Sequence, residues 1–178
     1  MPVQLRPRVH SLIDSHCHLD MVIERGLGVE EITRCLTDNG VGALVEIGAD
    51  KQAMLWARTL AHTSKQFEVY YTIGHHPGEA ATNAQGGAGS TADTMSSVPT
   101  TEDFEFGLKF IDENQSDKRF VAVGEIGLDY HYHADQADVQ KRVFIEFVRA
   151  SRRARRGIAI HTRDAHADTF SILRDEAK

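Results

Sequence analysis

The order of apolar segments constrains the fold of this chain more than any other feature of its sequence. Short runs rich in β-branched and aromatic residues alternate with longer segments whose apolar residues recur at three- and four-residue steps, the period of an amphipathic helix. We expect strands at 11–15, 41–47, 68–73, 119–124 and 157–161, and helices at 29–38, 51–64, 102–114, 136–155 and 166–177. Strict alternation requires parallel strands joined by crossover helices, so the sequence predicts an α/β fold.

One segment departs from this alternation. Residues 82–101 (TNAQGGAGSTADTMSSVPTT) are rich in Gly, Ala, Ser and Thr and contain almost no side chain that a core would bury. This composition favours a flexible insertion loop rather than a linker between domains. We therefore expect one domain over residues 1–178.

Composition and charge argue against several classes of protein. The net charge of −6 disfavours broad electrostatic binding to nucleic acid or to anionic membranes, although metal cations can still supply positive charge for a phosphate group. The opening MPVQLRPRVHS lacks the apolar region that a signal peptide would show, and no apolar run in this sequence approaches the roughly 20 residues of a membrane span. We expect a cytoplasmic protein without a membrane partner, and the sequence leaves the nucleus open. Cys17 and Cys35 form neither a CxxC pair nor a disulfide framework, so we expect two reduced thiols.

Side chains that bind metals gather where the expected strands finish. They are His16 and His18 after the first strand, His75 and His76 after the third, Glu125 and Asp129 after the fourth, and His161 at the end of the fifth. The ends of parallel strands meet at one edge of the sheet, so we expect these side chains to share one mouth. His16 and His18 are two residues apart and point to the same face of a strand, whereas Cys17 points to the other. Imidazoles combined with a carboxylate suit zinc, manganese or a magnesium-like ion.

Each of these motifs has a simpler interpretation when it stands alone. A single H-x-H at a strand end is more often packing than a ligand pair, and a histidine before proline, such as His76, commonly just ends a strand. The convergence of three strand ends therefore carries the metal prediction. Two further motifs are not assigned to the site. His131 and His133 are expected in a solvated loop, and the basic run RASRRARR (149–156) is expected on the opposite face, at a helix C-terminus.

The ordered set of motifs resembles a known family. DSHCHLD (14–20), GHHP (74–77), GEIGLDY (124–130), Gln140 with Phe144 on one helix, and IHTRDA (160–165) are similar in order and spacing to the TatD-type deoxyribonuclease family of the metal-dependent hydrolase superfamily. The resemblance implies a TIM-type (β/α) barrel, of which this chain carries the first five βα units. It also implies metal-dependent hydrolysis of phosphodiester bonds, with DNA as the substrate.

The resemblance further implies roles for individual residues. His16 and His18 would bind one divalent metal ion, His161 would bind a second, and Glu125 would bridge the two and act as the catalytic carboxylate. The ions would be zinc, magnesium or manganese. His76 would line the substrate pocket, and Arg163 would lie near the substrate phosphate or brace the ligand loop. Asp129 would orient ligands without binding metal itself.

Other functions stay open at this stage. A complete barrel takes eight strands, and the later histidine and aspartate motifs of the family have no counterpart before Lys178. We therefore regard the chain as the N-terminal portion of a single hydrolase domain and expect little nuclease activity from it alone. One alternative is a truncated, non-catalytic product that still binds metal. Another is a related hydrolase of amide or ester bonds, although Glu125 stands where the carbamylated-lysine enzymes have lysine. The sequence predicts no oligomeric state.

Overall fold

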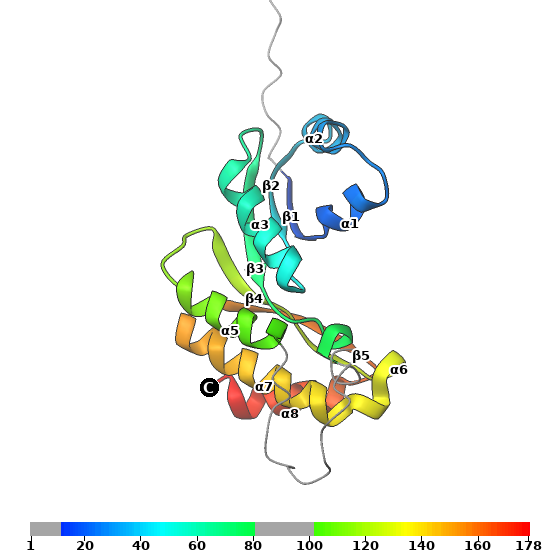
Figure 1. Cartoon of the computed structure of the whole chain (residues 1–178), viewed down its shortest axis with the longest axis vertical. Helices are drawn as coiled ribbons and strands as arrows, with labels where there is room; N and C mark the ends of the chain where they lie inside the picture. Colours follow the sequence, from blue (N-terminus) through cyan, green and yellow to red (C-terminus); the bar gives the residue numbers. More distant parts are fainter. Residues whose placement is uncertain (1–11, 81–101) are drawn as a thin grey trace, which may run out of the picture.

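The structure is a computed structural model, and it describes residues 12–80 and 102–178 (Figure 1). One five-stranded sheet runs through it in the order β1-β2-β3-β4-β5, and every neighbouring pair is parallel. The strands are β1 (Leu12–Cys17), β2 (Val41–Glu46), β3 (Glu68–Ile73), β4 (Phe120–Asp129) and β5 (Gly157–Arg163). The predicted α/β fold with parallel strands is confirmed.

Helices follow the strands along the chain. They are α1 (Leu19–Glu24), α2 (Val29–Asp38), α3 (Lys51–Thr63), α5 (Glu102–Glu113), α6 (Tyr130–His133), the 3₁₀ turn η1 (Ala134–Gln136), α7 (Ala137–Ala154) and α8 (His166–Glu176). The core lies where α3, α5 and α7 pack against β3 and β4. None of the helices in the described ranges is long and apolar enough to cross a membrane.

Helix α7 packs against the core through the apolar face that its sequence pattern predicts. Its apolar residues recur at three- and four-residue steps, and Phe144, Phe147 and Val148 are fully buried. The burial of each such side chain stabilises the fold by about 1.5 to 3 kcal/mol. Arg155 ends the helix in the left-handed conformation, with φ of 52°.

Three strands end later than the sequence predicts. Strand β1 was expected to end at residue 15, but it continues to Cys17, so His16 lies inside it. Strand β4 was expected to end at residue 124, but it continues to Asp129, so Glu125 and Asp129 lie inside the strand rather than after it. Strand β5 likewise continues past His161 to Arg163. The physical reason is pairing, because backbone partners on β5 extend the ladder from Ile126 to Asp129 although the GEIG sequence is poor in strand formers.

Two short helices were also missed. The segment from Tyr130 to His133 was expected to be a loop, but it forms the helical turn α6, because the Asp129 carboxylate accepts hydrogen bonds from the amides of His131 and Tyr132. Helix α1 was not predicted at all. The segment 82–101, expected to be a flexible insertion, lies outside the described residues.

The basic run at 149–156 lies where the sequence predicts, at the edge opposite the ends of the strands. The Arg156 guanidinium stands 5.5 Å above the ring of Phe120, the first residue of β4. Arg149 forms ion pairs with Glu146 and Glu176. This run is therefore engaged in holding α7 to its neighbours.

Candidate metal centre

The H-x-H pair reaches the predicted position beside Glu125. His16 lies in β1 and His18 directly after it, with ring centroids 5.2 Å apart. Their Nε2 atoms stand 3.4 and 3.7 Å from Glu125 Oε2. Cys17 points away from them and packs against the core, as its place in the strand predicts.

A second group of possible ligands shares the same carboxylate. His161 Nδ1 lies 3.1 Å from Glu125 Oε1, and His76 Nε2 lies 3.2 Å from His161 Nδ1. The family resemblance places His76 in the substrate pocket, and in the structure its imidazole lies beside His161 and Glu125. In each group the donor atoms lie within 4.8 Å of one another. These are the two such groups of three found among residues 12–80 and 102–178.

The donor chemistry fits a divalent cation. Each group offers two imidazoles and one carboxylate, which is a ligand set of catalytic zinc sites and also suits manganese. Glu125 is largely buried, with 12% of its side chain exposed, whereas His16 is 43% exposed. The site is thus partly open to solvent at His16, while its carboxylate is largely shielded from solvent.

Two glycines let the backbone bring Glu125 to this position. A Cβ atom at Gly74 would lie 2.6 Å from the Glu125 nitrogen, so only glycine allows the end of β3 to approach β4 so closely. Gly127 has a φ of 148°, and a Cβ atom there would lie 1.9 Å from the His161 carbonyl oxygen. The glycines of the GHHP and GEIG motifs therefore serve close packing around the site.

Contacts between Glu125 and the imidazoles set the charges of the site. Burial raises the pKa of the Glu125 carboxyl, but contacts with His161 and His18 outweigh burial and hold this pKa well below its usual range. The same contacts raise the pKa of His18 and of His161 above the usual imidazole value. Burial lowers the pKa of His76. Glu125 is thus ionised at neutral pH, and a cation entering here competes with protons on His18 and His161.

Asp129 supports His161 from behind. Its Oδ2 atom lies 3.0 Å from His161 Nε2, while Oδ1 caps the short helix α6. Gln140 on α7 donates to the Asp129 carbonyl and accepts from its amide at 2.7 Å. Asp129 belongs to neither ligand group, and its orienting role stays a prediction.

The rim of the site contains a contact that the sequence did not reveal. The Arg163 guanidinium stands 4.5 Å above the ring of Tyr132, which is exposed. His131 Nδ1 lies 3.0 Å from Asp164 Oδ2, so His131 pairs at the surface and joins neither ligand group. Arg163 thus stacks on a partner 31 positions earlier in the chain, and its contact with substrate stays a prediction.

His75 differs sharply from its neighbour His76. It is buried, with its ring parallel to that of Phe147 at 6.2 Å, and neither ring nitrogen has a hydrogen-bond partner among residues 12–80 and 102–178. Burial lowers the pKa of His75 to about 4, so this imidazole is neutral. The two histidines of GHHP therefore have different environments, and only His76 reaches the site.

Relatives of known sequence match most of the chain. The protein shares 28% identity over 165 residues with the uncharacterized metal-dependent hydrolase YabD of Bacillus subtilis (strain 168), covering 93% of this chain and 56% of the relative. It shares 36% identity over 74 residues with the deoxyribonuclease Tat-D of Schizosaccharomyces pombe, which is 40% of this chain and 24% of that protein. The chain spans about half the length of the hydrolases that it matches along most of its own length.

Solved structures share the fold. An uncharacterized amidohydrolase from Saccharomyces cerevisiae superposes with a TM-score of 0.71 at 20% identity, covering 92% of this chain and 51% of that one. The TatD homologue YJJV from Escherichia coli K12 superposes with a TM-score of 0.64 at 21% identity, covering 92% and 55%. The five strands correspond to a curled half of the TIM-type barrel of these proteins. The family model described as TatD related DNase matches residues 13–178, and the chain belongs to this family.

Proposed function

We propose that this chain supplies the metal centre of a metal-dependent hydrolase that cleaves phosphodiester bonds in DNA. The observation that carries the proposal is the pair of ligand groups that share Glu125 at one edge of the sheet. The family is described as TatD related DNase, and the fission yeast relative is named a deoxyribonuclease. The assignment of DNA as the substrate rests on these two names together with the ligand set.

The proposed roles follow from the positions of the side chains. His16 and His18 hold one cation with Glu125, while His76 and His161 hold a second with the same carboxylate. When bound, a pair of divalent cations polarises a phosphoryl oxygen and lowers the pKa of an attacking water.

Two further side chains complete the proposed site. Asp129 accepts a hydrogen bond from His161 Nε2 and so keeps the Nδ1 lone pair directed at the centre. Arg163 offers a guanidinium for a substrate phosphate at the rim.

Other candidates rest on particular observations. Because the chain spans about half of its relatives, we treat it as the N-terminal portion of a single hydrolase domain, and a metal-binding product without catalysis is the second candidate. Hydrolysis of an amide or ester bond is the third, because the yeast neighbour is titled an amidohydrolase.

Titration calorimetry with manganese and zinc tests the metal centre. Glu125→Gln should lose most of the divalent affinity, because it removes the shared negative charge from both groups. His131→Ala is the matched control, since this nearby histidine pairs with Asp164 and joins neither group. Affinity that falls in the control and survives in Glu125→Gln would contradict the ligand assignment.

Release of nucleotides from linear DNA with magnesium, manganese or EDTA tests the reaction. Cleavage that needs the metal and disappears in Glu125→Gln supports the nuclease. Metal binding without cleavage of any substrate supports the non-catalytic candidate. Metal-dependent hydrolysis of ester or amide substrates in place of DNA supports the third.

A further inference from the structure

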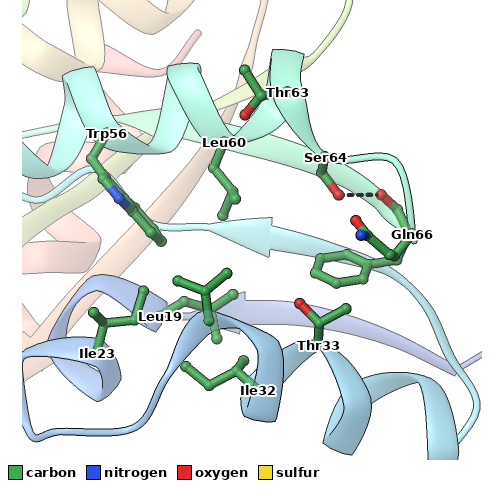
Figure 2. A pocket seen from close by; sticks show the side chains of 11 residues that line it. Leu19, Ile23, Ile32, Thr33, Trp56, Leu60, Thr63, Ser64 and Gln66 are labelled. Carbon is green, nitrogen blue, oxygen red and sulfur yellow. Dashed lines mark hydrogen bonds between the residues drawn. The ribbon is translucent and has the colours of Figure 1, made fainter.

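The turn that carries His16 and His18 is poorly anchored by apolar packing. Five of the six residues of β1 are exposed, and α1 contains no buried residue. A cavity of about 240 Å³ lies beside the turn, where Leu19 and Ile23 face Trp56 and Leu60 of α3 across open space (Figure 2). Cys17 and Leu19, on either side of His18, are only partly buried against the core, so hydrogen bonds must add to the apolar packing that fixes His18.

A buried carboxylate lies directly behind this turn. Glu46 is the last residue of β2, pairs with Cys17 in the sheet, and is 0% exposed. Its Oε1 accepts a hydrogen bond from the Leu19 amide at 2.9 Å, and its Oε2 accepts one from the Cys17 thiol at 3.3 Å. The carboxylate thus binds the residues on both sides of His18 without touching the imidazole.

The surroundings of Glu46 make a charged carboxylate energetically unfavourable at this position. No described cation pairs with the carboxylate. Burial, together with the charge of Asp20, raises its pKa to about 7 although the hydrogen bonds from Leu19 and Cys17 lower it. A carboxylate in such a place is unfavourable unless its hydrogen bonds are needed. The Cys17 carbonyl also accepts from the Ile47 amide at 3.0 Å, so the end of β2 fixes this part of β1 on two sides.

We propose that Glu46 is a positioning residue for the metal centre: it fixes the turn around His18 so that both imidazoles of the H-x-H pair face Glu125. This inference rests on the proposed metal centre and adds a residue outside both ligand groups. Residues that hold ligands in place typically change metal affinity by about 10- to 100-fold when they are removed. Glu46 holds the ligands through the Leu19 amide and the Cys17 thiol, and its charge also helps to raise the pKa of His18.

Manganese affinity, measured from the free-ion signal in electron paramagnetic resonance, tests the proposal. Manganese is chosen because thiolates bind it poorly, so that Cys17 and Cys35 do not interfere. Glu46→Leu should weaken binding about 10- to 100-fold, and Glu46→Gln should keep most of the affinity, because its amide oxygen can still accept from Leu19. Tyr71→Phe is the control, since Tyr71 is also fully buried and hydrogen-bonded, but to Asp117 and Asn114.

The control separates positioning from general stability. Tyr71→Phe should lower the melting temperature and leave manganese affinity unchanged, whereas Glu46→Leu should lower affinity by more than its melting temperature explains. Equal affinities in the wild type and Glu46→Leu would overturn the proposal. Losses that are equal in the leucine and glutamine variants and follow the melting temperature would overturn it as well.

A second pair of variants covers the case in which Glu46→Leu does not fold. Leu19→Pro removes the amide that donates to Glu46, at the first position of α1, where proline is otherwise tolerated. Leu19→Ala removes the side chain and keeps the amide. Weaker manganese binding in the proline variant than in the alanine variant supports the proposal, and equal binding overturns it. A wild-type chain that binds no manganese contradicts the metal centre itself, which is a different result.

Discussion

Individual buried polar residues near the sheet edge differ in whether their nitrogen and oxygen atoms form hydrogen bonds. Glu46, Asp129 and Gln140 are all buried, and each makes two or more hydrogen bonds. His75 is equally buried, and neither of its ring nitrogens makes a hydrogen bond within the part of the chain that the structure describes. An unpartnered buried polar group costs about 1 to 3 kcal/mol, so His75 is a site where the fold is less stable than it can be.

Replacing His75 tests this reasoning. We expect His75→Leu to raise the free energy of unfolding at pH 7.5 by about 1 kcal/mol, because leucine has a similar volume and no polar atoms to desolvate. The substitution should also remove the loss of folding stability that the wild type undergoes in acid. The folded-state pKa of about 4 lies below the ordinary imidazole value of 6.5, so the stability that neutral His75 allows is present above pH 6.5 and is lost as pH falls toward 4.

Urea unfolding followed by circular dichroism between pH 4.5 and 7.5 measures both effects. The wild type should lose stability over this range by up to about 3 kcal/mol more than His75→Leu does. His166→Leu, at an exposed histidine of α8, should not change the acid dependence. If the two leucine variants behave alike, His75 is not the group that couples stability to pH.

At the scale of secondary-structure elements, helix α7 and strand β4 are joined by apolar packing and by one polar side chain. Gln140 is fully buried among the apolar residues of α7 and bonds the Asp129 amide, the Asp129 carbonyl and the His133 carbonyl. It thereby holds the end of β4 and the start of α6 at the helix. The Asp129 carboxylate, which supports His161, depends on the same link.

We expect Gln140→Leu to destabilise the fold by about 2 to 4 kcal/mol, because it leaves buried backbone groups of residues 129 and 133 without partners. Thermal unfolding measures this loss, and manganese affinity should fall with it as His161 loses its support. Gln115→Leu is the matched control, since that glutamine is exposed and its side chain donates a hydrogen bond to the exposed Asp112. A stable Gln140→Leu protein with normal affinity would show that packing alone positions the end of β4.

At the scale of the whole molecule, the sheet is open at both sides. Strands β1 and β5 each pair with one neighbour among the described elements. Large apolar side chains are exposed along these margins, among them Leu12, Ile13, Ile160 and Phe170 at 40 to 69%. Open strand edges with exposed apolar residues favour association with other strands.

We expect the isolated chain to self-associate in a concentration-dependent way. Sedimentation velocity should show species heavier than the 19.8 kDa monomer, and Ile13→Thr should shift the distribution toward the monomer, because it keeps a β-branched residue and reduces apolar exposure. Leu55→Gln is the control, since Leu55 is also exposed but lies on α3. Monomers at every concentration would show that the open margins do not promote association.

The sequence by itself determined the arrangement of the elements and most of the site. The alternation of strand patterns and helix patterns predicts a parallel sheet. Each helix carries the chain back along the sheet, so the next strand runs in the same direction as the one before. The two-residue period of a strand places His16 and His18 on one face, and strand ends at one edge bring them near Glu125 and His161. These conclusions need only local geometry and the direction of the chain.

Only the tertiary structure decided the remaining features. The extension of β4 to Asp129, the contact of His76 with His161, the stacking of Arg163 on Tyr132 and the place of Glu46 behind His18 each join residues of different segments. Local propensity disfavours a strand through GEIG, and nothing near Glu46 in the sequence indicates a buried carboxylate. Hydrogen bonds and burial between segments outweigh local preference, and their partners are fixed only once the sheet has assembled.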